Sequence, residues 1–377
     1  MKKERKMTMA DPWVTAYEAN FVKKAMLDGW TKYQYVEEFQ PKFAKYHNRK
    51  YGIMTPNCHS AIHLLLLALG IKEGDEVIVP ECSWIGTVAP VTYTRATPVF
   101  CDMEEDTWCI DPKSVEKRIT KKTKAIIAVD LFGNMPNMDS LENLSKKYKI
   151  SLIEDAAESL GSSYKGIKAG KFGVGSTFSF HRTKTLTTGE GGMLLLDDEK
   201  LYKRAMFLRD TGRHHTIPYW TMELAPKYMP FNIQAAIGLA QFHRLDELLA
   251  KKRQIFGWYK KHLANISDIQ LNQDNDIVHN SAWATTLVFG KATRMTKKKV
   301  IAKLTELGLP SRPFFYPFSM LPAFKHNKTG GRKKNPVTYS VSERGIILPA
   351  SFSLNEQDVK KYCNAIKTIL NEKSDFD

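Results

Sequence analysis

Short, wholly apolar runs alternate with segments of helical periodicity between about residue 50 and residue 160. Apolar strands separated by amphipathic helices are typical of βαβ units, so the pattern predicts a parallel sheet covered on both faces. The predicted strands lie within 73–80, 96–103, 124–133 and 150–158, and the predicted helices are 61–71, 112–121 and 139–149. Ligands of such sheets bind beyond the carboxyl ends of the strands.

The pattern changes after about residue 235. Residues 235–266 keep a helical periodicity and are predicted to bridge to a second, smaller α+β domain. That domain is predicted to hold strands at 284–290 and 344–349, helices near 297–307 and 355–371, and a polar, basic surface loop at 325–336. The sequence therefore predicts a large α/β domain over 1–250, with the N-terminal segment, and a small domain over 251–377.

Composition supports a globular protein with anionic partners. Hydrophobic residues make up 43% of the 377 residues, which is ample for a buried core. The net charge of +16 favours nucleic acid, membrane headgroups or phosphorylated small molecules as partners. The basic clusters are scattered, however, and are typical of solvated helix faces. Without zinc-finger spacing or an RNP-type aromatic strip, the sequence predicts no binding to nucleic acid.

Cysteine usage and the apolar runs bear on the compartment. The five cysteines are odd in number and irregularly spaced, which indicates free thiols in a reducing compartment. The charged start of the chain has no apolar stretch behind it, unlike a signal peptide. The longest apolar run, 62–71, is too short to span a bilayer. We therefore expect a cytoplasmic protein without a membrane partner.

Two segments carry candidate chemistry. TFSFHRTKTLTTGEGG, residues 177–192, places Lys184 between a β-prone strip and a glycine-rich turn. A lysine near a buried strand can lose its proton and attack a carbonyl as an amine. Asp155 ends the apolar strand ISLIED, where a lone carboxylate needs a cationic partner. Pyridoxal phosphate, an aldehyde with a protonatable ring and a phosphate, would use both residues. A helix N-cap for Asp155 and an ordinary exposed lysine at 184 remain the alternatives.

Other motifs favour neither metal nor nucleotide cofactors. No G-x-x-x-x-G-K-[ST] loop is present, and the glycines of AGKFGVGS (169–176) have the wrong spacing for a dinucleotide fingerprint. His59 and His63 stand four apart, as zinc ligands on a helix can. No third ligand stands at helical spacing, so a helix-start loop and a packed histidine explain this pair better.

The segments LIEDAAE and FSFHRTKTLTTGEGGM together resemble those of the DegT/DnrJ/StrS family of sugar aminotransferases. The similarity extends from DGW (28–30) through EGDEVIVP and TPVFCD to RPFFYPFSMLPAF (312–324) and RGIILP. It implies a fold-type-I enzyme, like aspartate aminotransferase, that uses pyridoxal 5′-phosphate. RPFFYP is most visibly shared with the perosamine-synthase-like branch. A related branch that removes a hydroxyl has histidine in place of the lysine, and Lys184 argues against that branch.

The resemblance implies a role for each of several residues. Lys184 would be the Schiff-base lysine, and Asp155 would pair with the pyridinium nitrogen. Trp84 would stack on the ring, and Glu158 would face the ring hydroxyl.

The phosphate would contact Ser179 and the backbone amides of the loop PNCHSA (56–61), which contains Cys58, His59 and Ser60. A helix N-terminus of this kind binds anions.

Two departures from the family concern the phosphate site. Relatives usually have Gly-Thr where this chain has Cys58-His59. Many relatives place Asn or Arg, reaching the neighbouring subunit's phosphate, where this chain has Met229. Asn232 is expected to compensate as a cofactor-binding residue.

The resemblance implies a ping-pong transaminase with L-glutamate as the amino donor. The acceptor would be a nucleotide-linked 4-keto-6-deoxyhexose, and the product a 4-amino-4,6-dideoxy sugar of the perosamine or viosamine type. A homodimer with shared active sites is also implied. The alternatives are amination at C3 or of another keto-sugar, and a catalytically silent protein that binds sugar nucleotides.

Overall fold

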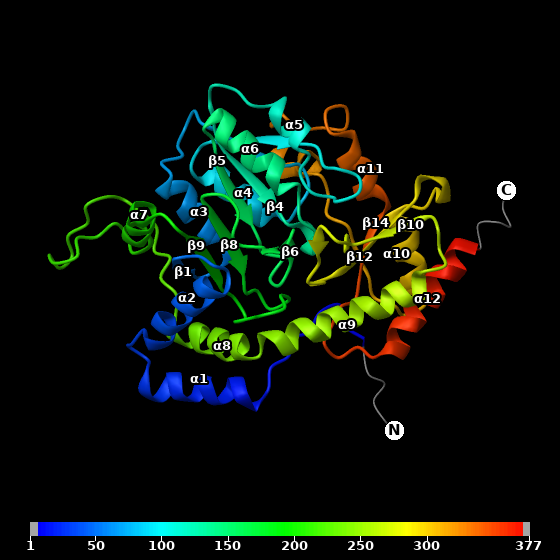
Figure 1. Cartoon of the computed structure of the whole chain (residues 1–377), viewed down its shortest axis with the longest axis horizontal. Helices are drawn as coiled ribbons and strands as arrows, with labels where there is room; N and C mark the ends of the chain where they lie inside the picture. The colour runs from blue at the N-terminus through cyan, green and yellow to red at the C-terminus, as the bar shows by residue number, and fades with distance from the viewer. Residues whose placement is uncertain (1–6, 372–377) are drawn as a thin grey trace.

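The computed structural model describes residues 7–371, and a seven-stranded sheet forms its centre (Figure 1). The strand order is β1-β9-β8-β5-β4-β2-β3, and the last five strands of this order pair in parallel. Strand β9 runs antiparallel to both β8 and β1. The strands are β1 (Tyr51–Thr55), β2 (Glu76–Pro80), β3 (Thr97–Cys101), β4 (Thr123–Val129), β5 (Ser151–Asp155), β8 (Gly175–Ser179) and β9 (Gly192–Leu196). The predicted mostly parallel sheet is confirmed.

Helices cover both faces of this sheet because successive residues of a strand point to opposite sides. In β4, Ala125 and Ile127 pack in one cluster with α3 and α4, while Ile126 and Ala128 pack in another with α5 and α6. The helices of this part are α1 (Ala16–Asp28), α2 (Gln34–Tyr46), α3 (Cys58–Ala68), α4 (Ile85–Tyr93), α5 (Pro112–Glu116), α6 (Met138–Tyr148), α7 (Glu199–Arg209) and α8 (Asn232–His243). This two-sided burial explains why the strands read as unbroken apolar runs.

A second, antiparallel sheet of four strands follows α9 (Leu245–Leu263), in the order β10-β12-β14-β13. Its strands are β10 (Ile269–Leu271), β12 (Thr285–Phe289), β13 (Arg312–Pro313) and β14 (Gly345–Leu348). Side chains of α9, α10 (Lys297–Glu306) and α12 (Glu356–Asn371) form its core. Three short strands, β6 (Ser163–Tyr164), β7 (Ile167–Lys168) and β11 (Val278–His279), make a third sheet. The predicted strands and helices of the C-terminal part are confirmed.

The long helical stretch predicted from residue 235 is two helices, α8 and α9, which meet at Arg244. The Arg244 guanidinium lies 2.7 Å from Glu18 of α1 and 2.9 Å from Glu247, so it fixes the start of α9. Figure 1 shows α8 below the large sheet and α9 continuing to the small sheet. The predicted division between residues 250 and 251 falls within α9 and stays a prediction.

Two local predictions need correction, and one helix of the C-terminal part was missed. Helix α5 ends at Glu116, before the predicted residue 121. The 325–336 loop exposes its lysines, but part of it packs on the large sheet, where Glu81 accepts a hydrogen bond from the Gly331 amide at 3.0 Å. Helix α11 (Pro336–Arg344) follows this loop and was not predicted. Contacts with distant residues hold these segments, so their own sequence signal is weak.

The N-terminal segment joins the two parts of the molecule. The Met9 carbonyl accepts a hydrogen bond from the Ala350 amide at 2.9 Å, beyond β14. The Trp13 carbonyl accepts one from Gln241 Nε2 of α8, also at 2.9 Å. Residues 9–13 therefore contact both the segment that follows β14 and helix α8 below the large sheet.

The structure also bears on the expected compartment. All five cysteines are buried free thiols. No helix within residues 7–371 is long and apolar enough to cross a bilayer.

Candidate active site

Lys184 lies in the loop between β8 and β9 with only 12% of its side chain exposed. Its Nζ lies 3.1 Å from Glu158 Oε1 and 3.7 Å from the centre of the Trp283 ring. Its backbone N–H donates to the His181 carbonyl at 2.8 Å. A carboxylate, an indole and a local turn thus hold this amine in place, so it is not an ordinary exposed lysine.

Glu158 is buried in the loop that follows β5. Its second oxygen, Oε2, accepts a hydrogen bond from the Phe132 amide at 2.9 Å. Phe132 follows β4 and has a φ of 57°, a conformation that costs roughly 1 kcal/mol for a residue with a side chain. Both oxygens of Glu158 therefore have fixed partners, one of which is the Lys184 amine.

Asp155 is the last residue of β5 and is 3% exposed. Its Oδ2 accepts a hydrogen bond from Thr87 Oγ1 at 2.7 Å, and its Oδ1 accepts one from the Ala157 amide at 3.2 Å. Cys58 Sγ lies 4.0 Å from Oδ1. Burial raises the pKa of the Asp155 carboxyl, and the Thr87 hydrogen bond opposes that rise. No cationic side chain of the described residues forms an ion pair with Asp155.

The predicted phosphate loop forms the N-terminus of α3. Asn57 caps the helix, and its Oδ1 accepts hydrogen bonds from the Ser60 amide at 2.8 Å and the Ser60 hydroxyl at 3.0 Å. Within the described residues, no group accepts a hydrogen bond from the backbone amides of Cys58 or His59. Burial raises the pKa of the Cys58 thiol well above its ordinary value. The loop therefore has two backbone amides available to bind an anion, while the Ser60 hydroxyl donates to the N-cap residue Asn57.

The glycine-rich turn after Lys184 brings β9 against this loop. A Cβ on Gly192 would lie 2.4 Å from the Asn57 carbonyl carbon and 2.5 Å from Cys58 N, so only glycine fits. Ser179, paired with Gly192 across β8 and β9, accepts a hydrogen bond from the His181 amide at 3.3 Å. This close approach explains why the motif of residues 177–192 ends in glycine, which the sequence alone did not explain.

His59 and His63 have different surroundings along α3. The His63 Nδ1 lies 2.9 Å from the Tyr228 hydroxyl, and burial lowers the pKa of His63 to about 4. The His59 ring lies 5.3 Å from the Tyr93 ring, and burial also lowers the pKa of His59. Aromatic neighbours therefore account for both histidines without a metal.

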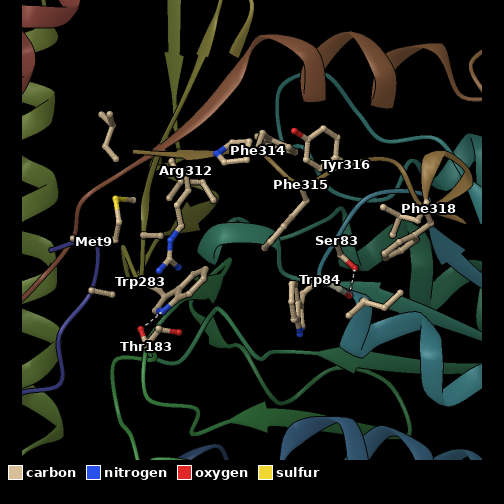
Figure 2. Close-up of a pocket in the computed structure, with 18 residues that line it drawn as sticks. Met9, Ser83, Trp84, Thr183, Trp283, Arg312, Phe314, Phe315, Tyr316 and Phe318 are labelled. Carbon is tan, nitrogen blue, oxygen red and sulfur yellow. Dashed lines mark hydrogen bonds between the residues drawn. The ribbon is translucent and has the colours of Figure 1, made fainter. Parts of the chain in front are cut away.

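Trp84 is the N-cap of α4 and lines a pocket of about 350 Å³, which Thr183, the residue before Lys184, also lines. The Trp84 side chain is 63% exposed, an unusual state for a tryptophan at the edge of a pocket. Figure 2 shows Trp84 and Trp283 facing each other across this pocket, and Trp283 Nε1 donates to the Thr183 carbonyl at 2.8 Å. The RPFFYP segment also lines this pocket, through Arg312, Phe315 and Tyr316.

Asn232 lies apart from the Lys184 contacts. Its Nδ2 donates to the Gly29 carbonyl at 2.9 Å, and its Oδ1 accepts a hydrogen bond from the Tyr35 amide at 3.0 Å. These bonds join α8 to the turn between α1 and α2. Met229 precedes α8 in the same chain segment. A role for Asn232 in cofactor binding stays a prediction.

Three candidate functional residues were not predicted from the sequence: Thr87, Trp283 and Arg312. Thr87 stands one helical turn after Trp84, and this spacing could have placed it at the end of β5. Trp283 lies just before β12 and Arg312 begins β13, and no local pattern places Trp283 beside Lys184 or Arg312 in the pocket.

Comparisons with known proteins agree with this arrangement. The model of the DegT/DnrJ/EryC1/StrS aminotransferase family matches residues 14–367. A GDP-perosamine synthase of Escherichia coli is 36% identical over 364 residues, covering 96% of this chain and 98% of that protein. A putative pyridoxal phosphate-dependent aminotransferase of Bacillus subtilis is 32% identical, covering 94% of this chain and 93% of that protein. The structure of a putative sugar aminotransferase of Streptococcus pneumoniae, in its PMP form, has a TM-score of 0.92 at 26% identity, covering 98% of both chains.

Proposed function

The chain belongs to the DegT/DnrJ/EryC1/StrS aminotransferase family and is a pyridoxal phosphate-dependent sugar aminotransferase, and from this premise we propose its substrates. It moves the amino group of L-glutamate to C4 of a nucleotide-linked 4-keto-6-deoxyhexose. The product is a 4-amino-4,6-dideoxy sugar nucleotide of the perosamine or viosamine type. The proposal rests on the 36% identity to a GDP-perosamine synthase over almost the whole chain.

The residues at the carboxyl end of the large sheet fit pyridoxal phosphate. Asp155 is a buried carboxylate that feels the charge of Lys184 but forms no ion pair among the described residues, so a protonated ring nitrogen would supply one. The free amides of Cys58 and His59, at the start of an eleven-residue helix, suit a phosphate, with Ser179 nearby in the strand pairing. Trp84 offers an exposed aromatic face for the ring.

When bound, pyridoxal phosphate supplies an aldehyde for amine exchange and a ring that withdraws electrons. Lys184 Nζ is the group that removes a proton from the substrate carbon and returns it, first as a base and then as an acid. Glu158 positions Nζ through the 3.1 Å contact. Asp155 holds the proton on the ring nitrogen, while Thr87 and the Ala157 amide fix the Asp155 carboxylate.

Removing the Thr87 hydroxyl should make the ionised form of the Asp155 carboxyl less stable. The Thr87 bond stabilises the ionised carboxylate and so lowers its pKa; in Thr87→Val the pKa of Asp155 rises further. Because Asp155 acts in its ionised form, the acidic limb of the kcat/KM profile should move to higher pH, with a loss of about tenfold at neutral pH. Steady-state rates between acidic and neutral pH test this. Thr87→Ser should keep the wild-type profile, and an unmoved limb in Thr87→Val would contradict the assignment.

The site of amination is tested by product analysis. The purified protein is incubated with L-glutamate and a panel of 4-keto and 3-keto 6-deoxyhexoses linked to GDP, UDP or dTDP. We expect 2-oxoglutarate to form beyond one equivalent per enzyme only with a 4-keto sugar, and NMR should place nitrogen on C4. Nitrogen on C3, or turnover of a different keto-sugar only, would replace the proposed substrate.

We also propose that two copies of the chain form a homodimer. The segment between α7 and α8 extends away from the rest of the molecule (Figure 1) and exposes large apolar side chains. Large apolar side chains are also exposed at the end of α1 and just after it. These are Ile217, Tyr219, Trp220, Met222 and Leu224 in the first case, and Met26, Leu27 and Trp30 in the second. Exposed apolar area on this scale indicates an interface. Light scattering should give twice the mass of one chain, and a monomer would exclude the dimer.

A further inference from the structure

The pocket wall formed by the RPFFYP segment is held from behind by one buried lysine. Lys297 is the first residue of α10 and is 9% exposed. Its Nζ donates to the Phe314 carbonyl at 3.0 Å and lies 3.7 Å from the centre of the Tyr316 ring. It also donates to the Ser342 hydroxyl at 3.0 Å. The three hydrogens of the ammonium thus have three partners, two of which belong to residues that line the pocket.

Ser342 extends this support to Phe315. Its hydroxyl accepts the hydrogen bond from Lys297 and donates to the Phe315 carbonyl at 2.6 Å. The same carbonyl accepts a hydrogen bond from Cys82 Sγ at 3.2 Å. One ammonium therefore supports three consecutive residues of the pocket wall, 314–316.

A buried ammonium is an unfavourable way to fill this space. No carboxylate within residues 7–371 forms an ion pair with Lys297, although the charge of Glu343 acts on the amine. Burial lowers the pKa of Lys297 to about 8, so most of the amine is still protonated at neutral pH. A buried cation without an anion destabilises the fold, and an apolar side chain of similar length would avoid that penalty. What the charged amine provides in return is the set of contacts to the pocket wall.

Strand pairing holds only the first part of the RPFFYP segment. Both residues of β13 pair with β14, and the Phe314 amide donates to the Gly345 carbonyl at 3.0 Å. Phe315 and Tyr316 lie beyond this pairing and are held through Lys297 instead. Loss of the ammonium should therefore release residues 315 and 316 while β13 keeps its place.

The Phe315 ring lies between the space for substrate and the groups that position the reacting amine. Figure 2 shows it extending between Trp283 and Trp84. It stacks on the Phe132 ring, with centres 5.2 Å apart and planes at 14°. The Phe132 ring is in turn parallel to Trp283, whose face contacts the Lys184 amine. A displaced Phe315 would therefore change the shape of the pocket near the reacting amine.

We propose that Lys297 is a positioning residue that sets the aromatic wall against which the keto-sugar lies. The inference rests on the proposed function. A 6-deoxyhexose presents a methyl group and the C–H face of its ring, which an aromatic wall accommodates. Glutamate carries two carboxylates, which bind through charged and hydrogen-bonding groups, so it depends less on this wall. Lys297 thus acts through Phe315 and Tyr316 on the acceptor half of the reaction.

The test separates the two halves of the reaction in the holoenzyme of Lys297→Met, whose new side chain has a similar length but no donor. In the first arm, loss of the visible absorbance of the bound cofactor is followed against L-glutamate concentration. Its half-saturation should stay within about twofold of wild type. In the second arm, return of that absorbance in the amine-loaded enzyme is followed against the keto-sugar nucleotide, whose half-saturation should rise roughly 10-fold. Calorimetry with the matching 4-hydroxy sugar nucleotide, which cannot be aminated, should show the same loss of affinity without turnover.

Two further variants make the result specific. Lys298 is exposed on α10, so Lys298→Met removes a neighbouring charge and should leave both arms unchanged. Ser342→Ala keeps the ammonium but removes the donor to the Phe315 carbonyl, so it should weaken the second arm alone, by about threefold. Ser342→Ala also decides the question if Lys297→Met does not fold.

The pattern of losses decides between the proposal and its alternatives. Equal losses in both arms would mean that Lys297 only maintains the fold, and a loss confined to the glutamate arm would assign the wall to the donor. Either result, or two unchanged arms, would overturn the proposal. If wild type aminates the keto-sugar and Lys297→Met does so with the same half-saturation, only the role of Lys297 is wrong. If wild type passes no amino group to any keto-sugar of the panel, the proposed function itself fails.

Discussion

Replacing Lys184 with alanine should abolish transamination in both directions. The amine that Glu158 and Trp283 hold in place is the group that links to the cofactor aldehyde and moves the proton. A general base contributes roughly 10²–10⁴-fold by itself, and loss of the covalent link adds to that. Turnover should fall below detection, and the visible absorbance of the linked cofactor should disappear. Rates of 2-oxoglutarate formation and the spectrum of the purified variant measure both effects.

Lys184→Arg is the matched control because it keeps the positive charge beside Glu158 but cannot link to an aldehyde. It should be as inactive as the alanine variant. Borohydride reduction of wild type, followed by peptide mapping, should attach the cofactor to the peptide that contains Lys184. An active, yellow Lys184→Ala protein would remove the basis of the proposed mechanism.

Asp155→Asn should fold normally and lose most of its activity, by roughly 10²–10³-fold in kcat. The amide has the shape of the carboxylate: its Oδ1 can still accept the Ala157 hydrogen bond, and its Nδ2 can donate to the Thr87 hydroxyl, which accepts equally well. It carries no charge, however, so it cannot keep a proton on the ring nitrogen, and the ring withdraws electrons less well. Single-turnover rates with glutamate isolate this step from sugar binding.

Asp155→Asn also removes a buried carboxylate whose burial raises its pKa, so the apo protein should be at least as stable as wild type toward urea. Lost activity together with lost stability would indicate a structural role for Asp155. Near-normal turnover would exclude its proposed role with the cofactor.

The sequence predicted strands β2 to β5 of the large sheet because these strands are buried on both faces and read as plain apolar runs, as in β4 and β5. It also placed Asp155 at a strand end, since the polar residue interrupts such a run. The family resemblance was needed to choose Lys184 from the many lysines of the chain.

The remaining parts of the site depend on contacts between distant segments. Trp283 lies about a hundred residues from Thr183 in the chain, and only the folding of the small sheet over the large one joins them. Arg312 is part of a two-residue strand, too short to give a periodic signal. The 325–336 loop reads as polar surface because nothing in its own sequence shows the buried Glu81 that it covers.

The N-terminal segment decides where a purification tag can be attached without disturbing the enzyme. Met9 and Ala10 form part of the pocket wall and are held there by the Met9–Ala350 hydrogen bond. A tag or fusion partner at the start of the chain would join it within ten residues of that wall. Attached after α12 instead, the same tag would leave this wall unaltered, and kinetic constants from such a protein would describe the native pocket.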